Sequence, residues 1–342
     1  VDAGRTPWQR MILNAGKPQL DWKHPDGRVE SGPPELRFST VLSEAGAEKL
    51  LQGSGTTLGA ILDGAEKLDY ERRELGVALH VRARSSLAEV SSPNVVGILR
   101  GGDPALRDEH VVVTAHLDHV GIGAEVDGDA IYNGFYDNAM GSAILIEAAR
   151  ALAARPEPPR RSIVFLLVTG EEKGLLGSDY FADYPTVPAA SIVANVNIDM
   201  PLLLRPVADL VALGAEHSSL GALAEAAARA NGFGVAPDPN PEEVVFVRSD
   251  QYSFVRRGVP AINFNPGAAT RGGGDAQAQA IEAFREECYH RPCDEDDLGA
   301  DWDSVRRYAA TNAGLVALVA DAEARPRWND SDFFGMTYSS AR

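Results

Sequence analysis

The sequence predicts an α/β fold with a mixed, mostly parallel central sheet flanked by helices. Short, almost continuous apolar runs alternate with stretches whose apolar residues recur at helical spacing. The 342 residues, 44% hydrophobic and 24% charged, are ordinary for a globular protein and sufficient for one large domain and a smaller piece. Polar side chains also stand where several apolar runs end.

The elements can be assigned in order along the chain. Residues 1 to about 70 are interrupted by proline, glycine and charges, with a strand-like stretch at 36–41 and a helix at 43–52 capped by Ser43. Further strands are expected over residues 77–82, 94–99, 110–115, 162–168, 192–198 and 261–264. Further helices are expected over residues 142–154, 175–184, 220–231 and 305–322. Residues 272–274 and 276–280 are typical of a flexible loop insert.

Histidine and acidic residues follow three of these predicted strands. The strands lead into His116 with Asp118, into Glu171 with Glu172, and into Asp199. In open α/β sheets, ligands bind beyond the carboxyl ends of the strands. We therefore expect these side chains to meet at one edge of the sheet.

Two further positions complete the candidate set. Asp137 lies in a turn with Gly134 just before a predicted helix, where its two oxygens could bridge two ions. Helix capping is the alternative role for this turn, and Asn138 is the better-placed cap. His290 lies beside Tyr289 in a late loop.

Imidazoles and carboxylates gathered in this way suit a pair of divalent metal ions. The carboxylate of Asp118 can accept a hydrogen bond from the His116 ring and so fix its tautomer. Glu171 and Glu172 are adjacent, so their side chains diverge and one can bind metal while the other stays free as a base. A solvated acidic turn is the alternative for this glutamate pair.

The remaining histidines and the cysteines carry weaker signals. His119 is expected to be a wall residue of the site instead of a ligand. Four other histidines have no metal-binding context and are expected to be structural or exposed: His24, His80, His110 and His217. Cys288 and Cys293 flank His290, and either a short disulfide or two free thiols fits their spacing.

The net charge of −17 argues against nucleic acids and anionic membranes as partners. It is compatible with modest attraction for cationic substrates, such as peptides with a free amine. No apolar run is long enough to span a bilayer. The start, Val1-Asp2-Ala3-Gly4-Arg5, has no signal-peptide character and no initiator methionine, which suggests a processed or trimmed chain.

At these residues the chain resembles the M28 family of co-catalytic zinc aminopeptidases, most closely bacterial members with a protease-associated domain insert. The resemblance implies a zinc exopeptidase fold over residues 72–328, an accessory segment at 1–71 that is similar to the end of a protease-associated domain, and a C-terminal tail at 329–342. It also implies a secreted or periplasmic protein.

The resemblance implies specific roles. Asp137 would bridge two zinc ions, with Co²⁺ or Mn²⁺ also compatible, and a cis peptide would follow it. One ion would take His116 and Asp199, and the other Glu172 and His290. Glu171 would be the general base, Asp118 would orient His116, and Tyr289 would steady the oxyanion.

The chain departs from the usual family pattern at Phe135 and Tyr136, at Met140 and at Gln251. These departures replace no ligand, and they leave the shape of the specificity pocket unpredicted. The expected reaction is hydrolysis of the N-terminal residue of a peptide, with Glu171 taking the proton of a water molecule that bridges the metals.

Three alternatives stay open. A carboxypeptidase or dipeptidase of the same fold would need a cationic pocket, for which the candidates are Arg248, Arg256, Arg257 and Arg271. A glutaminyl cyclase would use similar ligands for one zinc. A non-catalytic binding protein on the same scaffold would be expected to lose ligands, which this chain has not done. The oligomeric state and the preferred N-terminal residue are not encoded in any motif.

Overall fold

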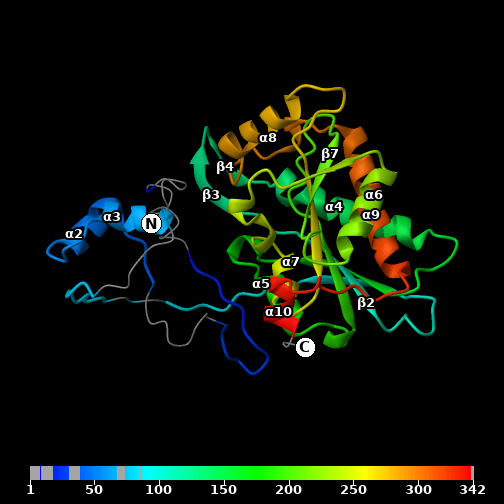
Figure 1. Cartoon of the computed structure of the whole chain (residues 1–342), viewed down its shortest axis with the longest axis horizontal. Coiled ribbons are helices and arrows are strands. Elements are labelled where there is room, and N and C mark those ends of the chain that lie inside the picture. Colours follow the sequence, from blue (N-terminus) through cyan, green and yellow to red (C-terminus); the bar gives the residue numbers. More distant parts are fainter. Residues whose placement is uncertain are drawn as a thin grey trace. The chain divides into compact units, whose positions relative to one another are not determined.

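The computed structural model describes residues 8, 18–30, 39–67, 74–82, 84 and 86–339. The chain divides into two units, residues 1–90 and residues 91–342 (Figure 1). The divisions predicted at residues 71 and 328, and the likeness of the first segment to a protease-associated domain, stay predictions.

The described residues of the first unit include the short helices α2 (Glu44–Leu51) and α3 (Leu58–Glu66). The hydroxyl of Ser43 accepts a hydrogen bond from the backbone N–H of Gly46, which confirms the predicted cap and helix. Ala47 and Leu51 of α2 pack with Leu58 of α3 in a small apolar cluster. The capped start and the apolar contact together account for this helix pair.

Of the two strands predicted in this unit, one lies partly outside the described residues and the other does not form. Residues 36–38 lie outside the described residues, and residues 39–41 form no strand. Residues 77–82, whose alternating pattern predicted a strand, are also irregular. Their apolar side chains at Val77, Leu79 and Val81 are exposed. Alternation alone cannot form a strand without a neighbouring strand to supply backbone hydrogen bonds and a covered face.

The second unit is built on a seven-stranded sheet of order β1-β5-β2-β6-β9-β7-β8. Its strands are β1 (Val95–Leu99), β2 (His110–His116), β5 (Ser162–Val168), β6 (Ile192–Asn197), β7 (Asp209–Leu213), β8 (Gly234–Ala236) and β9 (Ala261–Pro266). The central strands β5, β2, β6 and β9 are parallel. β1 runs antiparallel to β5, and β7 antiparallel to β9. The predicted mixed, mostly parallel sheet is confirmed.

Helices cover both faces of this sheet (Figure 1). One face packs against α4 (Met140–Ala153), α6 (Leu220–Ala230) and α9 (Trp302–Asp321), and the other against α5 (Leu176–Asp183) and α7 (Gln251–Val255). Among the helices of the described residues, none is both long and apolar enough to cross a membrane.

Several elements of this unit were not predicted. Besides β7 and β8, they include a hairpin of β3 (Gly121–Val126) and β4 (Asp129–Tyr132), and the helices α8 (Ala276–Glu287) and α10 (Phe333–Tyr338). The loop predicted over residues 276–280 is wrong, because these residues form the first turns of α8. Residues 276–280 alternate alanine and glutamine, which are both strong helix formers.

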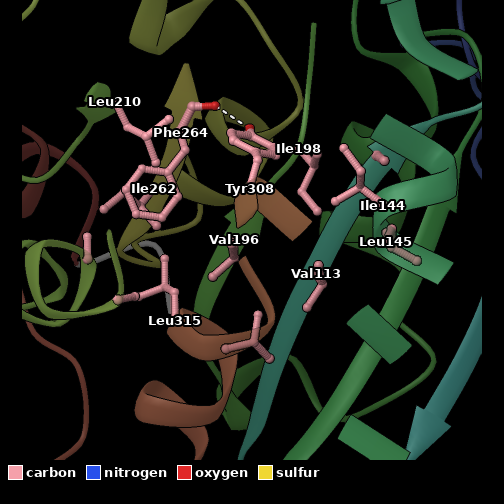
Figure 2. Packing of buried hydrophobic residues seen from close by; sticks show 14 of the residues in the cluster. Val113, Ile144, Leu145, Val196, Ile198, Leu210, Ile262, Phe264, Tyr308 and Leu315 are labelled. Carbon is pink, nitrogen blue, oxygen red and sulfur yellow. Dashed lines mark hydrogen bonds between the residues drawn. The ribbon is translucent and has the colours of Figure 1, made fainter. Parts of the chain in front are cut away.

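Side chains of β2 alternate between the two faces of the sheet. Val111 and Val113 belong to the larger core under α4 and α9, whereas Val112 belongs to the core under α5 and α7. Figure 2 shows the larger core, where the hydroxyl of Tyr308 donates to the carbonyl of Phe264. Each fully buried aliphatic side chain contributes about 1.5–3 kcal/mol. This double-sided packing fixes the edge of the sheet at which the polar residues emerge.

Candidate metal centre

The structure brings together the predicted residues at the carboxyl edge of the sheet. His116 is the last residue of β2, and Asp199 follows β6 by two residues. Glu172 lies in the turn that connects β5 to α5, and Asp137 in the turn before α4. His290 lies in the loop after α8.

One half of the site is built around His116. Its Nε2 atom lies 3.2 Å from Oδ1 of Asp137 and 3.1 Å from Oδ1 of Asp199. Its Nδ1 atom lies 3.0 Å from the backbone carbonyl oxygen of Asp118. The second carboxylate oxygen of Asp199 accepts a hydrogen bond from the hydroxyl of Ser249 at 2.6 Å.

The other half is built around His290. Its Nε2 atom lies 3.1 Å from Oδ2 of Asp137 and 3.1 Å from Oε2 of Glu172. The two oxygens of Asp137 therefore face two different histidines, each of which has a further carboxylate beside it. This is the arrangement expected of a carboxylate shared between two cation positions.

The fully buried residue Asp294 fixes the backbone around Asp137 by accepting hydrogen bonds. Its carboxylate accepts the N–H groups of Tyr136 at 2.9 Å and of Asp137 at 3.1 Å. The peptide bond between Asp137 and Asn138 is cis, as the family resemblance implied. The Asn138 side chain donates to the carbonyl of Ile198 at 2.9 Å and so joins this turn to the end of β6.

Asp118 is directed mainly at the glutamate turn. Its carboxylate oxygens lie 3.2 Å from the backbone nitrogen of Glu171 and 3.4 Å from that of Glu172, and accept from both. The same carboxylate is 3.9 Å from Nδ1 of His116. Asp118 thus contacts His116 through its carbonyl oxygen and fixes the turn through its side chain. Its predicted role as the orienting residue stays a prediction.

The crowding of charges shifts the pKa values of the site. Burial alone would raise the pKa of Asp137, but its contacts with His116 and His290 lower it well below the usual range. Burial lowers the pKa of His116, and Asp199 and Asp137 outweigh that effect and raise it. Burial likewise opposes protonation of His290, yet Asp137 and Glu172 raise its pKa to about 9. In the metal-free site, the neighbouring carboxylates therefore favour the doubly protonated, cationic form of both imidazoles.

Glu171 differs from the other carboxylates of the site. Burial, Asp199 and Asp250 raise its pKa well above the usual value. Among the described residues, no basic side chain forms a salt bridge with Glu171, whereas Glu172 contacts His119 and His290.

The loop that carries His290 is closed by a disulfide between Cys288 and Cys293, which decides between the two alternatives for these cysteines. The Tyr289 ring stacks on His290 with its centroid 3.9 Å away. Burial and the carboxylates of Asp137 and Glu172 raise the pKa of Tyr289, so its hydroxyl stays protonated and able to donate.

The residues present fit divalent cations. The nitrogen and oxygen atoms of each half lie about as far apart as ligands of one ion bound at roughly 2.0–2.2 Å. Within the described residues, Nε2 of His119 is buried without a hydrogen-bond partner, and Nδ1 of His119 lies 2.9 Å from Oε1 of Glu172 without the geometry of a hydrogen bond. Such groups are costly unless a ligand or water satisfies them.

Sequence reasoning did not assign a role to Ser249 or Asp294. It predicted that His119 lines the site without binding metal. Ser249 was visible in the motif Ser249-Asp250-Gln251, and Asp294 follows His290 by four residues. The contacts of these residues are with backbone atoms or distant side chains, so a local pattern could not reveal them.

Three of the four arginines considered for a carboxypeptidase pocket have other partners. Arg256 and Arg257 form ion pairs with Asp179 of α5. Arg271 forms an ion pair with Asp303 of α9 at 3.1 Å. These pairings do not favour a cationic pocket at the metal centre.

Comparison with known proteins adds independent findings. The model of peptidase family M28 matches residues 94–316. Aminopeptidase NAALADL1 of Mus musculus is 27% identical over 190 residues, which is 51% of this chain and 24% of that protein. Aminopeptidase YwaD of Bacillus subtilis is 29% identical over 150 residues, which is 43% of this chain and 30% of that protein.

A solved structure, that of the zinc aminopeptidase BSAP from Bacillus subtilis, has a TM-score of 0.50 and 22% identity. The likeness covers 68% of this chain and 51% of that one, and it supports the fold. The matched part of this chain spans about a quarter to a third of the length of the relatives named above.

Proposed function

From the premise that this chain belongs to peptidase family M28, we propose that it is a two-zinc aminopeptidase that removes the N-terminal residue from peptides. The observation that carries the proposal is the placement of the two Asp137 oxygens, one toward His116 and the other toward His290. Aminopeptidases among the relatives support the activity, and zinc in the names of relatives supports the metal.

In this proposal, Asp137 is shared between the two ions. His116 and Asp199 would complete the ligands of one ion, and Glu172 and His290 those of the other. When bound, such ions lower the pKa of a water molecule and polarise a carbonyl group. Cobalt or manganese could replace zinc, because mixed nitrogen and oxygen ligands accept several metals.

Glu171 is proposed as the general base. Its carboxylate would accept a proton from the attacking water and pass it to the leaving amine. Burial and the neighbouring carboxylates raise its pKa, which is the direction that favours release of the proton as well as its acceptance. Asp118 fixes the backbone of the glutamate turn, and therefore the position from which Glu171 acts. The Tyr289 hydroxyl would donate to the oxyanion.

The proposed substrates are peptides with a free N-terminus. The acidic chain and the excess of carboxylates at the site favour a cationic amine over an anionic group. We also propose an extracellular or periplasmic location, because the Cys288–Cys293 disulfide suits an oxidising compartment.

The test combines metal analysis with assays on leucine and lysine anilides. The wild-type chain is expected to bind two zinc ions and to cleave free-amine substrates but not their N-acetylated counterparts. Glu171→Ala should abolish turnover and leave the zinc content intact, whereas the neighbouring Glu172→Ala should lose zinc. One zinc per chain together with pyroglutamate formation would instead identify a cyclase. Turnover retained by Glu171→Ala would remove that residue from its role.

A further inference from the structure

His119 lies against the metal centre without belonging to the ligand set proposed above. It follows His116 by three residues, and only 6% of its side chain is exposed. Its Nδ1 atom lies 2.9 Å from Oε1 of Glu172. The other oxygen of that carboxylate, Oε2, is the one that faces His290. His119 therefore contacts the outer oxygen of a proposed zinc ligand.

The His119 ring has little freedom to leave this position. It meets the His290 ring edge-on, with centroids 5.6 Å apart. On another side lies Gly134, whose φ is +69°, and a Cβ atom there would come within 2.4 Å of the His119 Cγ. The backbone of the turn that carries Asp137 thus packs directly on the imidazole, and a glycine is needed for that approach.

Glu172 is consequently contacted from two directions. Its backbone N–H is held by the carboxylate of Asp118, and its Oε1 atom lies against His119. A glutamate side chain has several rotatable bonds, so a fixed backbone alone does not aim its carboxylate. The 2.9 Å approach of His119 Nδ1 to the outer oxygen places a possible donor where this constraint is missing.

We propose that His119 is a positioning residue whose Nδ1–H donates to Oε1 of Glu172 and so directs Oε2 toward the cation position shared with Asp137 and His290. The inference rests on the two-zinc function proposed above. Hydrogen-bond partners of metal ligands typically change metal affinity about 10- to 100-fold when they are removed. Because His119 contacts Glu172 and not Asp199, loss of its side chain should weaken binding of the ion held by Glu172 and His290 and leave binding of the other ion unchanged.

The test compares zinc binding by metal-free wild type, His119→Leu and His119→Asn, measured by competition with a chromophoric chelator. Leucine removes the donor and keeps much of the volume, whereas the asparagine amide can occupy the place of Nδ1 and donate. We expect His119→Leu to bind one zinc about 10- to 100-fold more weakly and the other unchanged. His119→Asn should bind both ions within a few-fold of wild type and should retain kcat at saturating zinc.

His110→Leu is the matched control, because His110 lies at the opposite end of β2 and contacts Ser191. If His119→Leu does not fold, His119→Ala takes its place in the comparison. Wild-type affinity at both positions in His119→Leu would overturn the inference. Equal weakening in the leucine and asparagine variants would overturn the hydrogen-bonding role and identify His119 as a direct ligand. A wild-type chain that binds fewer than two zinc ions would instead contradict the proposed function.

Discussion

Individual side chains at the metal centre gain their properties from close neighbours. His290 illustrates this, because Asp137 and Glu172 raise its pKa from 6.5 to about 9. A raised histidine pKa means that the protonated ring stabilises the metal-free fold. That stabilisation is complete below pH 6.5, the unfolded value, and is lost as the pH rises through about 9.

We therefore predict that metal-free protein loses stability between pH 6.5 and 9.5 partly through His290. The loss should be about 2 kcal/mol, less than the full shift implies because 28% of the side chain is exposed. Urea unfolding of wild type and His290→Gln at both pH values measures it. The glutamine variant should show a smaller difference; an identical pH dependence in the two proteins would contradict the prediction.

Asp294 carries a second prediction for a single residue. Asp294→Ala leaves the buried N–H groups of Tyr136 and Asp137 without their acceptor, which should cost about 2 kcal/mol or more of stability. Zinc binding should weaken too, because the turn that presents Asp137 loses its support. Asp296→Ala, at an exposed position two residues away, is the control and should change stability by less than about 0.5 kcal/mol. Chemical unfolding with and without zinc separates the two variants.

At this scale, sequence reasoning could identify residues by chemistry and by their place after a strand. His116, Glu172 and Asp199 carry both signals, and the structure gathers them with Asp137 and His290. It could not identify partners such as Ser249 and Asp294. Serine and aspartate are common in loops, and their contacts here depend on chain segments that only the fold brings together.

At the scale of elements, the loop between α8 and α9 carries His290 and also supports the turn that carries Asp137. The Cys288–Cys293 disulfide closes the loop around Tyr289 and His290, and the next residue, Asp294, supports the Asp137 turn. Cys293 is exposed, so a dithiol can reach the bond. One short cross-link therefore constrains two of the proposed ligands.

Replacement of both cysteines by serine should lower stability by about 2 kcal/mol, the entropic effect of so small a loop. It should also weaken the zinc position that includes His290 more than the one that includes His116. Zinc titration of the double variant, and of wild type treated with a dithiol, measures both effects. Unchanged affinity at both positions would show that packing alone holds the loop.

The elements show which local signals are sufficient. Strands β2, β5 and β6 were predicted almost to the residue because their apolar runs are buried on both faces. β7 and β8 were missed because they are short and are completed by neighbours distant in sequence. The start of α8 gives no helix signal because its first turns lack a conspicuous apolar stripe, and the residue buried there, Gln277, is polar.

At the scale of the whole molecule, the proposed ligands come from segments spread between residues 116 and 290. Bound zinc would link β2, β5 and β6 with two loops. We predict that chelation lowers the melting temperature, because a ligand at 1,000 times its Kd adds about 4 kcal/mol to stability. Scanning calorimetry with and without zinc measures this change. Glu171→Ala should show the same zinc effect as wild type, since Glu171 is not a proposed ligand.

The fold class was predictable because buried strands and amphipathic helices alternate along most of residues 91–342. The order of the strands and the antiparallel direction of β1 and β7 could not be predicted from the sequence. They depend on which strands become neighbours in the folded sheet. The same reasoning explains residues 77–82, where an alternating pattern did not decide whether a partner strand is present.

Asp137 has a single negative charge to share between the two proposed zinc ions. The first cation to arrive draws electron density from the carboxylate and leaves a poorer donor for the second, which must also approach a positive neighbour. Uptake should therefore be stepwise, with unequal affinities. A sample supplied with one equivalent of zinc would consist mostly of half-loaded molecules, and its activity would report a different species from that of the saturated protein.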